Sequence, residues 1–347
     1  MLSKKNQSET SEIQAPSLWN TNPLMIWLKR NMAAMIALVF LCIILSITTD
    51  TFLVKNNLLS VLRQVCVNGF IAFGITCVLI CGGIDLSVGS VVAAAGVIAV
   101  RCGNAGLPVI LCFLIPLLFG AVIGLFNGYV ISHTTLPPFI VTLSMQIIVR
   151  GVSYILTGGQ PAQSNNETFN NMGVGSFLGI PIPVVFVIVA FVILYFIMNR
   201  TSFGRHVYAT GGNKEAAKYA GVDTKWIQVR VFIISGVMAA LAGVVLAARL
   251  YSGQPSVGEG FERDAIAASV LGGTSFNGGI GTMGGTVIGV LIIGVLNNGM
   301  NLLKISSYWQ FVVKGCVILG AVYVDYLKKE RFSQKVILHN LDGGIRT

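Results

Sequence analysis

Long apolar runs separated by short polar segments fill the chain from about residue 31 onward. A helix needs roughly 20 consecutive, mainly apolar residues to cross a bilayer. The pattern therefore predicts an all-α polytopic membrane protein with about ten transmembrane helices, the eighth being the shortest. The predicted spans are 32–49, 65–81, 84–100, 107–131, 138–156, 183–198, 227–248, 263–275, 283–302 and 308–326.

The polar ends of the chain divide it into three parts. Residues 1–30 are predicted to form an N-terminal tail, 31–327 the membrane domain and 328–347 a C-terminal tail. No A-x-A-like site closes the first apolar run, so we expect an uncleaved first span rather than a signal peptide. Basic residues concentrate in both tails and in the loop 199–226. By the positive-inside rule, these three segments are expected in the cytoplasm.

Composition agrees with a membrane protein and excludes several other classes. Of the 347 residues, 54% are hydrophobic and only 10% charged, whereas about a quarter of the residues in a soluble domain are charged. The net charge of +10 does not indicate nucleic-acid binding, because the basic residues are divided among short segments. The seven cysteines lie in or beside apolar runs without metal-ligand spacing, which argues against a metal site or a disulfide framework.

The sequence offers no candidate catalytic residues. The three histidines are scattered, and the phosphate-binding pattern G-x-x-x-x-G-K-[ST] is absent. We therefore expect that the chain is not an enzyme and binds no nucleotide or other cofactor itself.

A polar stretch, CGGIDLSVGS at 81–90, interrupts the apolar pattern between the second and third spans. A charge at the centre of a bilayer is costly, so Asp85 is expected at a helix start, where its carboxylate can accept backbone N–H groups. Gly82 and Gly83 permit the turn, and Ser90 permits close helix packing. Asp85, Ser87 and Ser90 are thus candidate residues of a structural turn or of the translocation path. A proton-relay role for Asp85 is the alternative.

Two weak similarities suggest an internal repeat. The segment Gly124–Gly128 resembles Gly294–Gly299, and Asp85 recurs 179 positions later as Asp264. Both pairs are five spans apart, and an odd shift means that the two halves cross the membrane in opposite directions, as in many transporters. Chance agreement between glycine-rich segments is the alternative. Asn127 and Asn297 are predicted to face the translocation path, because amides are costly in lipid without partners.

Two loops are candidate docking surfaces. In 200–230, Asn213 can cap a short helix that carries Glu215 in its first turn and ends at Gly221. That helix suits either a lever against a cytoplasmic partner or a helix lying on anionic lipid. The loop 157–182 falls outside and either docks an extracytoplasmic partner or serves no such role.

Three of these stretches together resemble the permease subunits of bacterial ABC importers for monosaccharides, the ribose-permease type, over residues 30–327. They are GGIDLSVGS, GNKEAAKYAGV and LGGTSFNGGIGTMGGTVIGVLIIGVLNNGMNLL. The resemblance implies a type II-like permease in the bacterial inner membrane, with spans 2–5 and 7–10 related by inversion and both termini cytoplasmic.

The resemblance also implies the partners of such a subunit. They are a second permease subunit, expected to be an identical copy, two ATP-binding subunits that hold ATP–Mg²⁺, and a periplasmic or lipoprotein sugar-binding protein. The loop 200–226 corresponds to the coupling region. Its candidate contacts with the ATPase are Asn213, Lys214, Glu215, Ala216, Ala217 and Gly221.

Other functions remain open at this stage. An ion-coupled secondary transporter can also contain inverted repeats and carboxylates at helix ends. Related ABC permeases transport autoinducer-2, nucleosides or branched-chain amino acids, and a membrane enzyme or scaffold is a third class. Ribose is the first expectation among pentoses and hexoses, although the binding protein usually selects the sugar in this family.

Overall fold

Helices make up almost the whole of the structure, a computed structural model that describes residues 23–320, 322–323 and 326. The predicted tail 328–347 and residues 1–22 of the N-terminal tail lie outside the described residues. The helices are α1 Pro23–Thr48, α2 Lys55–Ile80, α3 Val88–Asn104, α4 Val109–His133, α5 Pro138–Thr157, α6 Glu167–Val174, α7 Ile182–Arg200, α8 Ser202–Gly212, α9 Lys214–Tyr219, α10 Thr224–Leu250, α11 Phe261–Leu271 and α12 Met283–Leu302, and residues 307–320 are also helical.

Seven helices in the described part of the chain are long and apolar enough to cross a membrane. They are α1, α2, α4, α5, α7, α10 and α12. Each contains one of the predicted spans or most of it. α2 begins at Lys55, ten residues before the predicted span 65–81. Its first turns contain polar residues, which the search for apolar runs left out.

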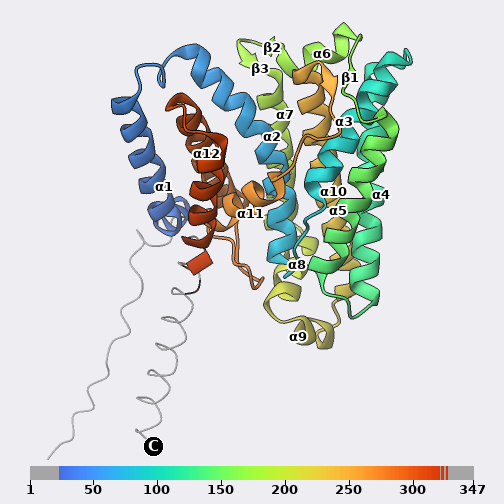
Figure 1. Cartoon of the computed structure of the whole chain (residues 1–347). Coiled ribbons are helices and arrows are strands. Elements are labelled where there is room, and N and C mark those ends of the chain that lie inside the picture. Colours follow the sequence, from blue (N-terminus) through green and yellow to red (C-terminus); the bar gives the residue numbers. More distant parts are fainter. Residues whose placement is uncertain (1–22, 321, 324–325, 327–347) are drawn as a thin grey trace, which may run out of the picture.

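Two of the predicted spans have different bounds in the structure. α3 runs from Val88 to Asn104, so it starts four residues later than the predicted span 84–100 and has the same length of 17 residues. α11 has 11 residues, which at 1.5 Å per residue is about 16 Å, roughly half of the hydrocarbon thickness. The prediction that 263–275 is one continuous helix is therefore wrong. Glycines with positive φ flank α11: Gly260 (φ +84°) before it and Gly273 (φ +85°) after it. In Figure 1, α11 lies midway between the α6 end and the α9 end of the molecule.

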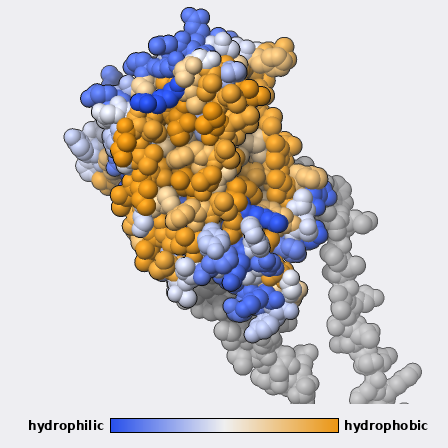
Figure 2. Space-filling model, turned by 90° about the vertical axis from the view of Figure 1, so that its right-hand side faces the viewer, coloured by the Kyte–Doolittle hydropathy of each residue, from blue (hydrophilic) through white to orange (hydrophobic). Residues whose placement is uncertain are grey.

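Exposed apolar side chains form a broad hydrophobic band on the outer helices. Figure 2 shows it on the face that carries α4 and α5, between polar atoms at either end. Exposed apolar side chains such as Leu118 and Phe126 of α4 and Ile147 and Ile155 of α5 contribute to this band. A soluble protein rarely exposes so large an apolar surface, so the band is the lipid-facing surface of a membrane protein.

Glycines allow the central helices to pack closely. Gly120, Gly124 and Gly128 follow one face of α4, and a Cβ at any of the three would overlap the backbone of α10. Spacing of small residues at every fourth position is a common means of helix association in lipid. On the other side of the molecule, Gly289 of α12 lies against the carbonyl of Ala268 in α11 in the same way.

The central helices are interlocked across the sequence. α10 packs on α3 and α4, which lie far earlier in the chain, while α2 packs on α11 and α12, which lie far later. Large side chains in α2, among them Phe70, Ile71 and Ile75, are almost completely buried as a result. α1 packs on α12, and α7 packs on α2, at the edges of this core.

Short elements cover the two ends of the bundle. At one end lie α6 and two antiparallel strand pairs, β1 with β4 and β2 with β3 (Figure 1). At the other end lie α8 and α9 (Figure 1). The strands are β1 Ala162–Gln163, β2 Ser176–Phe177, β3 Ile180–Pro181 and β4 Ser252–Gly253. The loop 157–182 is therefore folded, although its sequence shows only polarity.

Candidate functional site

Asp85 lies at the centre of a buried hydrogen-bond network. Its Oδ1 accepts from the backbone N–H and the hydroxyl of Ser87, at 3.0 and 2.6 Å. Its Oδ2 accepts from the hydroxyl of Ser235 on α10 at 2.8 Å. Asn127 of α4 donates its Nδ2 to the Ser87 hydroxyl at 3.0 Å. The network thus joins the turn before α3 to α4 and α10.

This arrangement agrees in part with the predicted helix start. Asp85 accepts a backbone N–H there, but Ser87 rather than Asp85 is the residue at the N-cap position. Gly82 adopts φ +83° in the turn. Ser90 is completely buried in α3, and its hydroxyl has no hydrogen-bond partner. Gly89 lies against the carbonyl of Gly258, in the connection before α11, so the close approach is made by a turn rather than by a helix.

The second aspartate has different surroundings. Asp264, in the first turn of α11, pairs with Lys314 of the 307–320 helix at 2.9 Å. Asn297 of α12 donates its Nδ2 to the same Oδ2 atom at 3.2 Å. The other amide atom, Asn297 Oδ1, is buried without a hydrogen-bond partner. The carboxylate is therefore held by one cation and one amide, and the neighbouring amide oxygen is available to accept.

A polar cavity of about 310 Å³ opens beside this pair. α2, the end of α10, α11, α12 and the 307–320 helix each contribute to its lining. The residues are Gln64, Val67, Asn68, Leu246, Arg249, Leu250, Phe261, Asp264, Asn297, Asn301, Gln310 and Lys314. Hydrogen-bonding groups thus converge with a few apolar side chains, which is the usual composition of a site for a small polar molecule.

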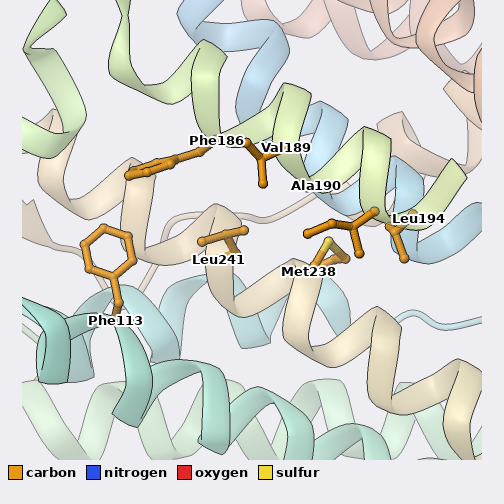
Figure 3. A pocket seen from close by; sticks show the side chains of 8 residues that line it. Phe113, Phe186, Val189, Ala190, Leu194, Met238 and Leu241 are labelled. Carbon is orange, nitrogen blue, oxygen red and sulfur yellow. The ribbon is translucent and has the colours of Figure 1, made fainter. Parts of the chain in front are cut away.

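A second cavity, of about 220 Å³, has an apolar lining and lies between α4, α7 and α10. Figure 3 shows Phe113, Phe186, Leu241 and Met238 around it. No hydrogen-bonding side chain borders this cavity, so it offers nothing to recognise a hydrophilic solute.

The predicted short helix is present at the α9 end of the molecule. Asn213 caps it, since its Oδ1 accepts from the Ala216 N–H at 2.9 Å, and Gly221 follows it with φ +85°. Glu215 and Ala216 are exposed, while Ala217 is buried and anchors the helix against the bundle. Lys214 donates to Gln228 of α10 at 3.1 Å, so α9 is tied to a long helix of the core.

The structure brings some of the predicted site residues together and separates others. Asp85, Ser87 and Asn127 share one network, whereas Asn297 belongs to the polar cavity. Asn127 borders neither of the two cavities. Sequence reasoning did not identify the remaining polar lining of the cavity, because it comes from four separate helices. A usable signal existed: polar residues four positions apart within apolar runs, as at Gln64 and Asn68.

No group of three or more His, Cys, Asp or Glu side chains within the described ranges is arranged to hold a metal ion.

Comparison with known proteins identifies the type of molecule. The family model described as branched-chain amino acid transport system / permease component matches residues 57–322. The ribose import permease protein RbsC of Bacillus subtilis is 45% identical over 295 residues, which is 84% of this chain and 92% of that protein. RbsC of Escherichia coli K12 is 41% identical, covering 85% and 94%. The D-allose transport system permease protein AlsC of the same strain is also 41% identical, covering 81% and 87%. No solved structure gives a significant match.

Proposed function

Because this chain belongs to the family of branched-chain amino acid transport system / permease components, it is a non-catalytic membrane subunit of an ABC transporter, and we propose that it forms the import path for a monosaccharide, with ribose as the first candidate. The observation that carries the proposal is the 45% identity to a ribose permease along 92% of that protein's length.

One feature favours a sugar over an amino acid. The relatives at 41–45% identity are named for ribose and D-allose, although the family model carries an amino-acid description. The polar cavity is compatible with a sugar, because its amides, carboxylate and cations together can donate to and accept from sugar hydroxyls.

An inverted repeat accounts for the interlocked core. α2–α5 would form one half, and α10–α12 with the 307–320 helix the other, giving ten segments when α1 and α7 are added. The first helix of each half packs on the second and third helices of the opposite half. An aspartate near the start of a short helix is joined to an asparagine of the following helix in both halves, through Ser87 in the first and directly in the second.

The exposed side of α9 suits an ATP-binding partner. Glu215, Lys218 and Tyr219 project there without burial, and the capped ends give the helix a defined position. ATP–Mg²⁺ would bind on that partner and supply the free energy of transport. Movement of α9 passes to the core through its connection to α8 and through the Lys214–Gln228 hydrogen bond.

The α6 end of the molecule suits an extracytoplasmic binding protein. The hairpin of β2 and β3 exposes large apolar side chains at its tip, Phe177 and Leu178, of which 63% and 87% are accessible. The same orientation puts α9 and both termini in the cytoplasm of a bacterial cell, in agreement with the basic residues of the 199–226 loop.

A second, identical permease subunit would complete the pore. ATP binding and hydrolysis would alternate the pair between outward-open and inward-open states. The partners can shift this equilibrium only through contacts that differ between the two states.

Reconstitution with a cognate ATPase and binding protein tests the function. We expect labelled ribose to accumulate in proteoliposomes only with ATP, and accumulation to survive collapse of ion gradients. Excess D-allose and leucine serve as competitors to define the substrate class. Uptake by the chain alone, driven by a proton or cation gradient, would instead establish a secondary transporter.

A further inference from the structure

The polar cavity is built from three pairs of side chains with the same spacing. In each pair the residues are four positions apart, so both lie on one face of their helix. The pairs are Gln64 and Asn68 on α2, Asn297 and Asn301 on α12, and Gln310 and Lys314 on the 307–320 helix. Three amphipathic faces inside a lipid-embedded bundle thus converge on one space. Polar groups at such positions are costly unless they have partners. Gln310 already donates to Asn301 at 3.0 Å and Lys314 to Asp264 at 2.9 Å, and an occupant that forms hydrogen bonds would satisfy the groups that remain.

One lining group lacks a partner in the structure. Asn297 is 5% exposed, and its Oδ1 accepts no hydrogen bond. A buried acceptor of this kind costs about 1–3 kcal/mol when it is left unsatisfied. Its Nδ2 is already used by Asp264, so the free atom needs a donor, which a hydroxyl group can provide.

The size and chemistry of the cavity restrict the ligand. About 310 Å³ lies at the lower limit of ligand pockets, which favours a single small molecule. Arg249 and Lys314 donate, Asp264 accepts and the amides do both. Phe261 and Leu250 add apolar surface to the lining. A monosaccharide has hydroxyl groups that donate and accept, together with C–H faces that pack on apolar side chains.

The corresponding position in the first half has no cavity beside it, although Asn127 Oδ1 is likewise buried without a hydrogen-bond partner. There the aspartate is 1% exposed and the asparagine is completely buried, and neither borders a cavity described above. Side-chain hydroxyls of Ser87 and Ser235 occupy the Asp85 oxygens. In the second half, Asp264 is bound by a cation and an amide beside open space. Equivalent positions of the two halves therefore serve different purposes.

We propose that the cavity between α2, α10, α11, α12 and the 307–320 helix binds one monosaccharide during transport. Asn297 and Asp264 contact its hydroxyl groups, and Lys314 positions the carboxylate. This inference rests on the proposed function for the class of ligand, and it adds a site within a single subunit.

Thiol protection tests occupancy without ATP-driven transport. The variant Asn301→Cys, in the full-length purified chain, places an accessible thiol at the cavity. We expect ribose at ten times its dissociation constant to slow alkylation of this thiol by about tenfold, from mass action. Native Cys316 is exposed on another face of the same helix as Lys314 and serves as the internal control, since its alkylation rate should not change. Peptide-resolved mass spectrometry separates the two thiols.

Uptake measurements test the role in transport. In the reconstituted importer, Asn297→Leu should reduce the ribose uptake rate by roughly tenfold or more, because an apolar side chain leaves sugar hydroxyls unpaired. The matched control is Asn298→Leu on the same helix. Asn298 forms two hydrogen bonds with Asn57 of α2 and does not border the cavity. This variant therefore also loses buried amide contacts and some stability, but its uptake per folded transporter should stay within about twofold of wild type.

The outcomes separate this inference from the proposed function. Wild-type uptake with no protection at residue 301 by ribose, D-allose or L-arabinose overturns the cavity as a sugar site. Protection without ATP-dependent uptake supports the cavity and overturns the ABC importer assignment. Equal uptake losses in the Asn297→Leu and Asn298→Leu variants, without protection, indicate damage to α12 and also overturn the proposal.

Discussion

At the residue scale, Asp85 and Asp264 are both carboxylates within a lipid-embedded bundle, but different groups stabilise them. Asp85 is satisfied by two serines and one backbone N–H, all within the chain's own turn and α10. Asp264 depends on Lys314 and Asn297, which belong to two other helices. A carboxylate surrounded by neutral donors holds a turn in place, whereas one that shares a cavity with a cation can also meet a solute.

Substitution of Asp85 separates a structural role from a proton-relay role. Asp85→Asn keeps an oxygen for Ser87, and the Ser235 hydroxyl can accept from the new amide, so we expect uptake within about twofold of wild type. Asp85→Ala removes the acceptor of three hydrogen bonds and should destabilise the protein by about 3 kcal/mol, measured as a lower thermal midpoint in detergent. Loss of uptake in a stable Asp85→Asn variant would favour proton relay.

At the scale of elements, the contact of α4 with α10 depends on the absence of side chains. A Cβ on Gly124 would meet the backbone of Phe232, which cannot move without displacing a helix. Because lipid provides no hydrophobic force between helices, close packing is the main source of stability at this contact.

Gly124→Ala should therefore destabilise the bundle, by about 1–3 kcal/mol as for other overpacked sites. The measurement is the thermal midpoint of the purified chain in detergent. Gly151→Ala on α5 is the matched control, since nothing lies within 4 Å of a Cβ there. Equal midpoints for the two variants would show that α4 and α10 are not in close contact.

A charge reversal on α9 tests the docking surface. Glu215→Lys changes an exposed side chain in the first turn of α9, so folding should be unaffected while docking of the ATPase weakens. We expect ribose uptake to fall by about tenfold, the effect of a 1.4 kcal/mol loss at an interface. Glu167→Lys, also exposed in the first turn of its helix but at the opposite end, should leave copurification with the ATPase unchanged. Full uptake and normal ATPase copurification in Glu215→Lys would contradict coupling through α9.

Much of the element pattern could be read from the sequence. Hydrophobic length located the long helices, and the Asn213 cap with Gly221 located α9 closely. The predicted span 263–275 runs past the end of α11 at Leu271. Gly272 and Gly273 continue a run of small residues that is as apolar as a helix in a membrane. The actual end of α11 depends on a backbone turn that composition does not reveal.

The candidate site was only partly predictable for a related reason. Asn297 was identified as a single costly amide, but Gln64 and Gln310 matter only when three distant helices are brought together. The pairing of Asp264 with Lys314 likewise spans 50 positions. Long-range packing decides such contacts, whereas local periodicity decides the helices.

At the scale of the whole molecule, two chemically distinct ends face opposite sides of the apolar band (Figures 1 and 2). The α6 end presents an apolar hairpin tip, and the α9 end presents charged side chains such as Glu215 and Lys218. An importer needs this polarity, because substrate arrives at one side and the driving partner acts at the other.

Sidedness can be measured with an impermeant thiol reagent. Lys218→Cys should react in inside-out vesicles and Leu178→Cys in intact spheroplasts, because both positions are exposed but at opposite ends. In these vesicles and spheroplasts, native Cys316 is followed as a separate peptide. Labelling of both new thiols from the same side would contradict the proposed orientation.

α2 packs on helices of the second half of the core, and α10 packs on helices of the first half. This packing affects the stability of the chain during its synthesis. α2 contacts α11 and α12, which emerge from the ribosome some 200 residues later. During synthesis, Gln64 and Asn68 of α2 therefore lack the residues that surround them in the folded protein. A fragment that stops before α10 would leave α3 and α4 without their main support. The nascent protein should thus remain a substrate for quality-control proteases until its last third is inserted, and two separately expressed fragments should survive only when they are made together.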